Sequence, residues 1–271
     1  AGTGLSGGAL PRGDGIVLSL ARMNRILSID VDDRCVTVEP GVTNVSVTHA
    51  VASHGFYYAP DPSSQIACTI GGNIAENSGG VHCLKYGTTT NNLLGVQIVL
   101  PDGDLVDIGS GAMERAGYDL LALFTGSEGL LGIITRATLR ILPKPESARA
   151  LMAAFDSVAG AGAAVADIIG AGIIPAGMEI MDRLSIEAVE EFLGCGYPVG
   201  VESLLLVEAD GPAAEVDAQI AAVEALVRAA GSAEIRHADS PQERQLLWAG
   251  RKAAFPAMGR LSPDYYCMDG T

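Results

Sequence analysis

Residues 60–87 read PDPSSQIACTIGGNIAENSGGVHCLKYG, a long stretch dominated by Pro, Ser, Gly, Asn and Thr. A connection of this length without secondary structure is uncommon unless it binds something. Two Gly-Gly pairs, at 71–72 and 79–80, can bring backbone amides and short polar side chains close to a large ligand. A disordered linker is the alternative, but apolar residues that can anchor the stretch to a core argue against it. These anchors are Ile66, Ile70, Ile74, Val81 and Leu84.

The chain opens with a second glycine-rich segment, AGTGLSGG at residues 1–8, which contains the spacing G-x-G-x-x-G. In Rossmann folds this spacing follows a strand and opens a helix. Here Pro11 and Gly13 would break the first turns of such a helix. Asp30 lies at the distance of the acidic ribose ligand, but no crossover helix precedes it. The residues alone leave two interpretations open, an anion-binding loop of another fold and a surface turn.

The composition is that of an ordered globular protein with a strong negative charge. Of 271 residues, 48% are apolar and 18% are charged, and the formal net charge is −15. A field of this sign opposes nucleic acid and anionic membranes, so we expect neither as a partner. Five scattered cysteines without a C-x-x-C pair favour a reducing compartment, and no signal peptide is visible. We expect a cytoplasmic location and leave peripheral membrane association open.

The segment PKP at residues 143–145 marks the expected boundary between two domains, 1–144 and 145–271. In the first, the turn PDG predicts a hairpin between 95–100 and 104–108. Residues 60–90 are expected to lack secondary structure. The other elements expected there are a strand at 35–39, helices at 44–53 and 118–124, and a strand at 132–142.

The second domain shows strands and helices in regular alternation, which predicts an α+β fold. The order is that of a ferredoxin-like β-α-β-β-α-β sandwich with an additional helix between its middle strands. Ser240 and Glu243 form the signature of a capping box at the start of a final helix. The apolar run 159–178 is interrupted by glycines and a proline, so we interpret it as a core helix and a turn rather than a membrane span. Strands are expected at 148–155, 176–182, 202–209 and 233–237, and helices at 156–171, 183–193 and 212–230.

Several motifs in order resemble a known family. Residues 1–8 resemble the pyrophosphate loop of the FAD-binding domain of the vanillyl-alcohol oxidase (PCMH) type, and 60–64 with 69–73 resemble its next flavin loops. The resemblance continues through 77–80, 85–87, 126–129 and 131–135, and is strongest to flavoprotein subunits of glycolate oxidase and FAD-linked D-lactate dehydrogenases. It extends through WAGRK at 248–252 and SPDYYCMDGT at 262–271. The implied fold is a PCMH-type FAD-binding domain followed by a ferredoxin-like cap domain.

The resemblance implies a cofactor site for FAD. The loop at 1–8 would face the diphosphate through backbone amides, and the loops at 60–61, 69–73 and 77–80 would line the flavin and ribityl chain. Residues 128–134 would hold the adenosine side and the ring edge. Because the first loop has no histidine for a covalent link, we expect noncovalent FAD. The cofactor-binding residues so implied are Gly2, Thr3, Gly4, Leu5, Ser6, Gly7, Gly8, Pro60, Asp61, Thr69, Gly71, Gly72, Asn73, Asn77, Gly79, Gly80, Tyr86, Gly87, Glu128, Gly129, Gly132, Ile133 and Ile134.

The substrate implied by the family is a small 2-hydroxy acid, and Arg251 is the candidate ligand of its carboxylate. Arg251 follows Trp248 by one helical turn, so both side chains point the same way. Periodicity alone would favour a solvated helix charge, and the family motif is what assigns the binding role. Trp248 and Tyr266 are further substrate-binding candidates, and Tyr265 and Lys252 are weaker ones.

Relatives of this type also carry a strand-helix segment before the first loop and a downstream H-x-G-D-G-N-x-H stretch that supplies histidines and often a metal. Neither is present here, so we expect a fragment cut at both ends. The catalytic residues would then lie beyond Thr271, as would the ligands of any divalent metal. Whether the fragment alone binds FAD is left open.

The expected activity is FAD-dependent oxidation of glycolate or D-lactate to the 2-oxo acid, by hydride transfer to flavin N5. Electrons would pass to an Fe–S electron-transfer subunit or a quinone rather than to NAD. Two alternatives stay open: a sugar or lactone oxidase of the same FAD fold, and a flavin-binding module without catalysis.

Overall fold

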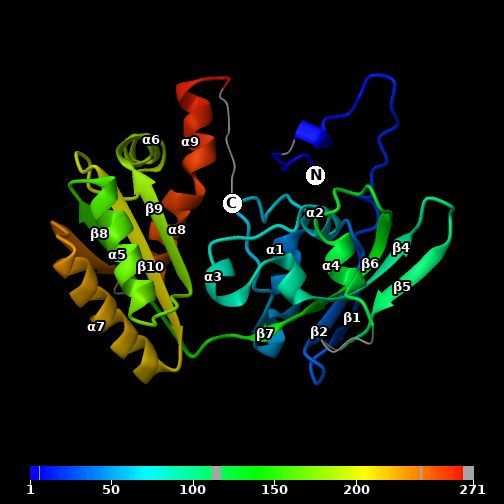
Figure 1. Cartoon of the computed structure of the whole chain (residues 1–271), viewed down its shortest axis with the longest axis horizontal. Coiled ribbons are helices and arrows are strands. Elements are labelled where there is room, and N and C mark those ends of the chain that lie inside the picture. The colour runs from blue at the N-terminus through cyan, green and yellow to red at the C-terminus, as the bar shows by residue number, and fades with distance from the viewer. Residues whose placement is uncertain (6, 112–116, 239, 265–271) are drawn as a thin grey trace. The chain divides into compact units, whose positions relative to one another are not determined.

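The computed structural model describes residues 1–5, 7–111, 117–238 and 240–264. It divides into two compact units, Ala1–Lys144 and Pro145–Thr271 (Figure 1). We call them unit 1 and unit 2. Each has its own sheet and its own apolar core.

In the described part of unit 1, five strands form a sheet in the order β1-β2-β6-β4-β5. All neighbouring strands are antiparallel, whereas a Rossmann domain is built on a parallel sheet. The predicted hairpin is confirmed, because β4 and β5 pair from Gly95–Gly109 to Val99–Leu105. The strands are β1 (Ile26–Asp30), β2 (Cys35–Val38), β4 (Leu93–Val99), β5 (Leu105–Gly109) and β6 (Ile133–Arg140), with a separate pair β3 (Phe56–Tyr57) and β7 (Leu142–Pro143).

The absence of secondary structure predicted for residues 60–90 was wrong, because short helices interrupt the stretch. Within α2, the side chains of Ile70 and Ile74 are fully buried in the core of unit 1, and this burial outweighs the poor helix propensity of two adjacent glycines. Thr69 caps the helix by accepting a hydrogen bond from the N–H of Gly72. The helices of unit 1 are η1 (Gly7–Ala9), α1 (Asn44–Val51), η2 (Ala52–His54), α2 (Ile70–Glu76), α3 (Cys83–Tyr86), η3 (Thr89–Asn92) and α4 (Leu120–Phe124).

Unit 2 has the predicted ferredoxin-like sandwich. Its antiparallel sheet runs β11-β8-β10-β9, so the first and third strands of the unit lie in the centre. Helices α5 and α7 cover one face, and α6 and α8 contact the sheet from the other (Figure 1). The elements are β8 (Ser147–Phe155), α5 (Val158–Gly170), β9 (Gly177–Asp182), α6 (Arg183–Leu193), β10 (Ser203–Gly211), α7 (Ala213–Ala229), β11 (Glu234–Ala238), α8 (Pro241–Lys252) and α9 (Ala254–Leu261).

The apolar run at 159–178 forms α5 and the turn after it, with Ala161, Ala164 and Ile168 buried in the core of unit 2. Over the part of the chain that the structure describes, no helix is both long enough and apolar enough to cross a membrane.

The start of α8 carries the predicted capping box. The N–H of Glu243 donates to Ser240 Oγ at 3.2 Å, and the N–H of Ser240 donates to Glu243 Oε2 at 3.1 Å. Ser240→Ala removes one of these bonds, so we expect the free energy of unfolding to fall by about 1 kcal/mol in urea titrations of the full-length protein. Gln242→Ala, an exposed change in the same turn, is the control and should have little effect.

Candidate functional site

The C-terminal end of α2 joins two of the predicted flavin motifs. Asn77 ends the helix with φ 51°, a left-handed conformation that asparagine tolerates. Its Oδ1 accepts hydrogen bonds from Thr88 Oγ1 at 3.1 Å and from the N–H of Thr90 at 3.0 Å. The carbonyl of Ser78 accepts two more from Thr89. The segment 77–80 is therefore fixed to the chain that follows the motif at 85–87.

Asp61 links two of the predicted flavin motifs, 60–64 and 77–80. Its Oδ2 lies 3.1 Å from His82 Nδ1, and its Oδ1 accepts from the N–H of His82 at 3.3 Å. Gly80 packs so closely that a Cβ there would lie 2.5 Å from the carbonyl carbon of Asp61. The loops 60–64 and 77–80 thus meet edge to edge.

The motif at 126–129 lies against the same helix. The N–H of Gly126 donates to the carbonyl of Ile74, and that of Glu128 to Ala75, both at 2.8 Å. Glu128 has φ 54°, a strained conformation for a glutamate and one often found at functional sites. Four predicted motifs, 60–64, 69–73, 77–80 and 126–129, are therefore brought together; we call them the α2 cluster.

Most glycines of the motifs fall into two groups according to the room around them. Gly72 and Gly126 are intermediate, because an added Cβ would lie 3.3 Å from Thr69 Oγ1 and 3.4 Å from Asn77 Cβ, respectively. In one group an added Cβ would lie within 3 Å of a neighbouring protein atom, so close packing demands glycine. In the other nothing lies within 4 Å, so the missing side chain leaves space for a ligand. The first group is Gly71 against Pro40, Gly79 against Cys83, Gly80 against Asp61, Gly87 against Asn91 and Gly132 against Ile98; the second is Gly2, Gly4, Gly7 and Gly129.

Several backbone amides of the long stretch bond within the protein. The N–H of Gly71 donates to the carbonyl of Pro40 at 2.8 Å, and the N–H of Gly80 lies 3.1 Å from Cys83 Sγ. In contrast, the side-chain nitrogen of Asn73 is buried, and no acceptor for it exists among the described protein atoms. Leaving such a donor unmet costs about 1–3 kcal/mol, so the centre of the α2 cluster fits a ligand that brings an acceptor.

The opening loop, residues 1–8, has fewer contacts with the rest of unit 1 than the motifs of the α2 cluster have, as far as the described residues show. Leu5 is 54% exposed, and among the described residues the hydrogen bonds of the loop are local, as from the N–H of Leu10 to the carbonyl of Gly7. The structure does not tie this loop, including Thr3, to the α2 cluster by a described hydrogen bond. Ser6 lies outside the described residues.

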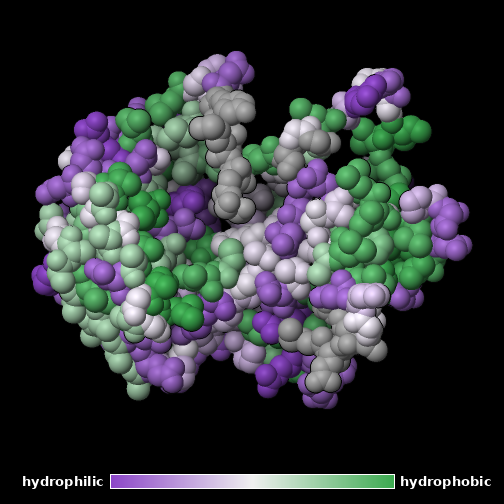
Figure 2. All heavy atoms as spheres, viewed as in Figure 1, coloured by the Kyte–Doolittle hydropathy of each residue, from purple (hydrophilic) through white to green (hydrophobic). Residues whose placement is uncertain are grey.

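The remaining cofactor candidates of unit 1 differ in their surroundings. Tyr86 packs edge-on against Tyr57 with ring centroids 6.2 Å apart, and Lys85 Nζ lies 5.3 Å from the ring centroid of Tyr86. The backbone carbonyl of Pro60 accepts a hydrogen bond from Asn44 Nδ2 at 2.9 Å. Ile134 is buried. Ile133 is more exposed. Figure 2 shows hydrophobic residues in green over α4 and its neighbours. The exposed apolar residues of this part of the chain are Leu120, Leu123, Leu130, Leu131 and Ile133.

In unit 2, one stripe of α8 carries Arg244, Trp248 and Arg251, and each meets a carboxylate of the sheet. Arg244 Nη1 donates to Glu208 Oε1 at 2.9 Å, and Trp248 Nε1 donates to Glu208 Oε2. Arg251 donates from Nε and Nη2 to Glu179 Oε2, at 3.2 and 3.0 Å. Trp248 is thus a buried anchor of the helix, whereas Arg251 stays about a quarter exposed.

Sequence reasoning missed both glutamates. Glu208 is only 2% exposed, and a buried carboxylate needs charged or hydrogen-bonding partners. The visible signal was that Glu208 follows four apolar residues in the strand LLLVEAD at 204–210. Glu179 gave a weaker signal because β9 is short and carries a second acid, Asp182.

A tight contact holds the middle of α8. A Cβ on Gly250 would lie 2.5 Å from Tyr197 Oη and 2.7 Å from Cys195 Sγ, and Tyr197 Oη donates to the carbonyl of Leu247. Burial, together with a hydrogen bond to Glu190, raises the pKa of the Cys195 thiol to about 11. Because the thiol is protonated at neutral pH, Cys195 serves packing rather than nucleophilic chemistry.

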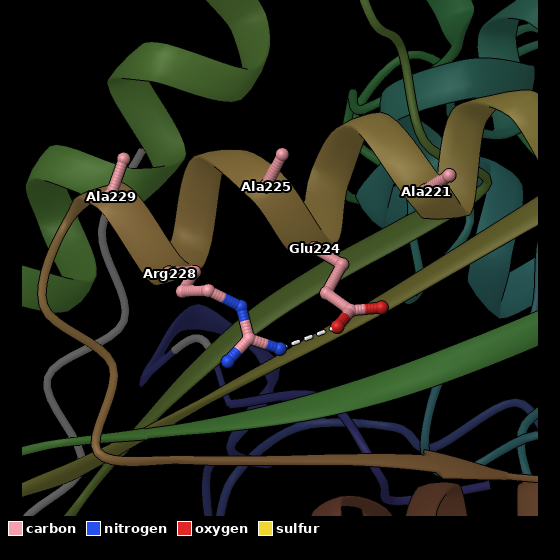
Figure 3. Close-up of a pocket in the computed structure, with 5 residues that line it drawn as sticks. All are labelled: Ala221, Glu224, Ala225, Arg228 and Ala229. Carbon is pink, nitrogen blue, oxygen red and sulfur yellow. Dashed lines mark hydrogen bonds and ion pairs between the residues drawn. The ribbon is translucent and has the colours of Figure 1, made fainter.

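Tyr265 and Tyr266 lie outside the described residues, and Lys252 ends α8. No group of three His, Cys, Asp or Glu residues in the described ranges is arranged to hold a metal ion. A shallow depression on α7, lined by three alanines and the Arg228–Glu224 ion pair, lies on the helix that covers the other face of the sheet from α8 (Figure 3). It offers little to a specific ligand, because Glu224 is already paired with Arg228 and with His237.

Comparison with known proteins finds a matching protein family for each of the two units. A family model for a FAD binding domain matches residues 1–109, and one for the C-terminal domain of FAD linked oxidases matches residues 144–271. The glycolate oxidase subunit GlcD of Escherichia coli K12 is 56% identical over all 271 residues, and that of Bacillus subtilis 41%. A D-lactate dehydrogenase of Anaerostipes hadrus is 35% identical over 94% of the chain. The chain spans 54%, 58% and 55% of these three relatives, about half their length.

A solved structure of alkyldihydroxyacetonephosphate synthase matches with a TM-score of 0.72 and 23% identity, over 89% of this chain and 46% of that one. This likeness concerns the fold alone. The two domain models follow each other in the order predicted from the motifs, and the similarity to curated relatives extends over both units. The chain therefore belongs to the FAD-linked oxidases.

Proposed function

We propose that the protein to which this chain belongs is a FAD-dependent dehydrogenase that oxidises a 2-hydroxy acid, glycolate or D-lactate, to the 2-oxo acid. The observation that carries the substrate class is Arg251, a partly exposed guanidinium held on α8 one turn after Trp248. The names of the relatives, glycolate oxidase subunit and D-lactate dehydrogenase, point to the same class of acid.

The α2 cluster is the proposed FAD site, with noncovalent binding. Its support is the open space at Gly129 and the unmet donor of Asn73. The opening loop, with open space at Gly2, Gly4 and Gly7, would meet the diphosphate. When bound, FAD supplies the acceptor for the hydride; the protein's own part is to position the acid and keep water away from it.

Arg251 would hold the substrate carboxylate through paired N–H···O bonds, which fix the acid in orientation as well as place. The electron acceptor is proposed to be an Fe–S subunit or a quinone; the relatives named as subunits support a multi-subunit enzyme. The described cysteines are free, which supports a cytoplasmic location.

A visible absorption spectrum of the full-length protein, recorded before and after anaerobic addition of glycolate or D-lactate, tests this proposal. A flavin band that bleaches with either acid is the expected result and establishes both cofactor and substrate class. A flavin band that neither acid changes would overturn the proposed substrate class. A colourless protein that takes up no added FAD would overturn the cofactor site as well.

A further inference from the structure

The geometry of the Arg251–Glu179 pair leaves part of the guanidinium unused. Both contacts come from its Nε–Nη2 edge and converge on one oxygen, Glu179 Oε2. A guanidinium carries five N–H donors in a fixed planar fork. Among the described residues Glu179 is bonded through Nε and Nη2, and the edge that presents one N–H each from Nη1 and Nη2 has no described partner. A single carboxylate can dock there bidentately while Glu179 stays in place.

The position of Glu179 is fixed by the sheet. It lies on β9 opposite Leu206 of β10, and Glu208 is two residues further along β10, so both glutamates face α8. Their partners Arg244 and Arg251 are seven residues apart, two turns of one helix. Glu179 is therefore a built-in partner of Arg251 and not a passing surface contact.

The charge of the pair has a consequence for the substrate. Arg251 and Glu179 carry formal charges that cancel, and both side chains are about three-quarters buried. An acid with one carboxylate replaces solvent at the open edge of Arg251. A second carboxylate on the same acid would add a further negative charge near Glu179, which is about three-quarters buried and therefore weakly screened by water, and like charges repel.

We propose that Glu179 is a specificity-determining residue that restricts this site to 2-hydroxy acids with a single carboxylate, and that it does so by occupying one edge of Arg251 and repelling a second negative charge. This inference rests on the proposed function. It predicts that the enzyme discriminates against 2-hydroxy dicarboxylic acids, and that the discrimination depends on the charge of residue 179.

The test compares wild type, Glu179→Gln and Glu179→Asp in the full-length enzyme. For each, kcat/KM is measured with D-lactate and D-malate, and the dissociation constants of the unreactive acids propionate and succinate are measured by calorimetry. Glu179→Gln keeps an oxygen that can accept from Arg251 but removes the charge. We expect it to raise the D-malate to D-lactate ratio of kcat/KM about tenfold. The dissociation constant of succinate should fall relative to that of propionate by a similar factor. Glu179→Asp keeps the charge and should keep the wild-type ratio.

Glu202→Gln is the matched control, because Glu202 pairs with Arg183 at 3.2 Å on an exposed surface of the same unit. It removes the same charge. It should leave unchanged both the D-malate to D-lactate ratio of kcat/KM and the ratio of the dissociation constants of succinate and propionate. Unchanged ratios in Glu179→Gln, or an equal shift in Glu202→Gln, would overturn the inference. If wild type oxidises neither glycolate nor D-lactate and does not bind propionate, the proposed function itself fails, which is a distinct outcome.

Discussion

Replacing Arg251 with alanine is expected to lower kcat/KM for glycolate and D-lactate by about two orders of magnitude in the full-length protein. A charge-assisted hydrogen bond is worth about 1.5–3 kcal/mol, and a loss near 2.7 kcal/mol corresponds to a factor of about one hundred. The change also leaves the Glu179 carboxylate without its guanidinium, so the site changes from neutral to negative. Both effects disfavour an anionic substrate.

Steady-state kinetics of Arg251→Ala and Arg251→Lys measure the effect. Lysine keeps the charge but not the planar fork, so an intermediate loss is expected. The ratio of flavin to protein, read from the spectrum, should match wild type in both variants, which separates substrate binding from cofactor binding. Arg183→Ala removes an exposed arginine of the same unit and serves as the control. An unchanged kcat/KM in Arg251→Ala would refute the carboxylate assignment.

Gly80→Ala is expected to weaken both the fold of unit 1 and its hold on FAD. The new Cβ would lie 2.5 Å from the carbonyl carbon of Asp61 and 2.6 Å from its oxygen, far inside van der Waals contact. Backbone atoms cannot move aside cheaply, so the loops 60–64 and 77–80 must separate. Overpacking of this kind costs about 1–3 kcal/mol. We expect a loss of FAD affinity of at least about tenfold, measured by flavin fluorescence titration, with a lower thermal midpoint.

Gly4→Ala is the matched comparison, because nothing lies within 4 Å of the Cβ that it would add. Its thermal midpoint should equal that of wild type or exceed it slightly. If the opening loop approaches the diphosphate, this variant still loses FAD affinity. Wild-type FAD affinity in Gly4→Ala would contradict the assignment of the opening loop to the cofactor site. Wild-type stability in Gly80→Ala would contradict the argument from close packing against Asp61.

The sequence predicted unit 2 more fully than unit 1, for a physical reason. In unit 2 the local pattern is enough, because α5 has apolar residues at helical spacing and β8 ends in a short continuous apolar run typical of a buried strand. In unit 1, α2 contains two adjacent glycines, and one of them, Gly71, is required by Pro40, which lies 31 residues earlier in the chain. No local pattern reports that contact, so the helix was taken for a loop.

The same distinction between local pattern and distant contact applies to the candidate site. Arg251 and Trp248 were found from a contiguous motif, whereas their partners are distant in sequence: Glu179 is 72 residues from Arg251, and Glu208 is 40 residues from Trp248. Only the packing of α8 on the sheet brings them together. A strand acid amid apolar neighbours could have flagged Glu208, but nothing in the sequence names its partner.

The buried carboxylate of Glu208 also fixes the register of α8. Apolar contacts tolerate sliding, but a fixed charge that bonds both Arg244 and Trp248 does not. A one-residue insertion between positions 244 and 248 would turn the second half of the helix by about 100° and leave the charge half satisfied. Homologous chains can therefore exchange apolar core residues in this unit far more readily than they can change the length of that helical turn.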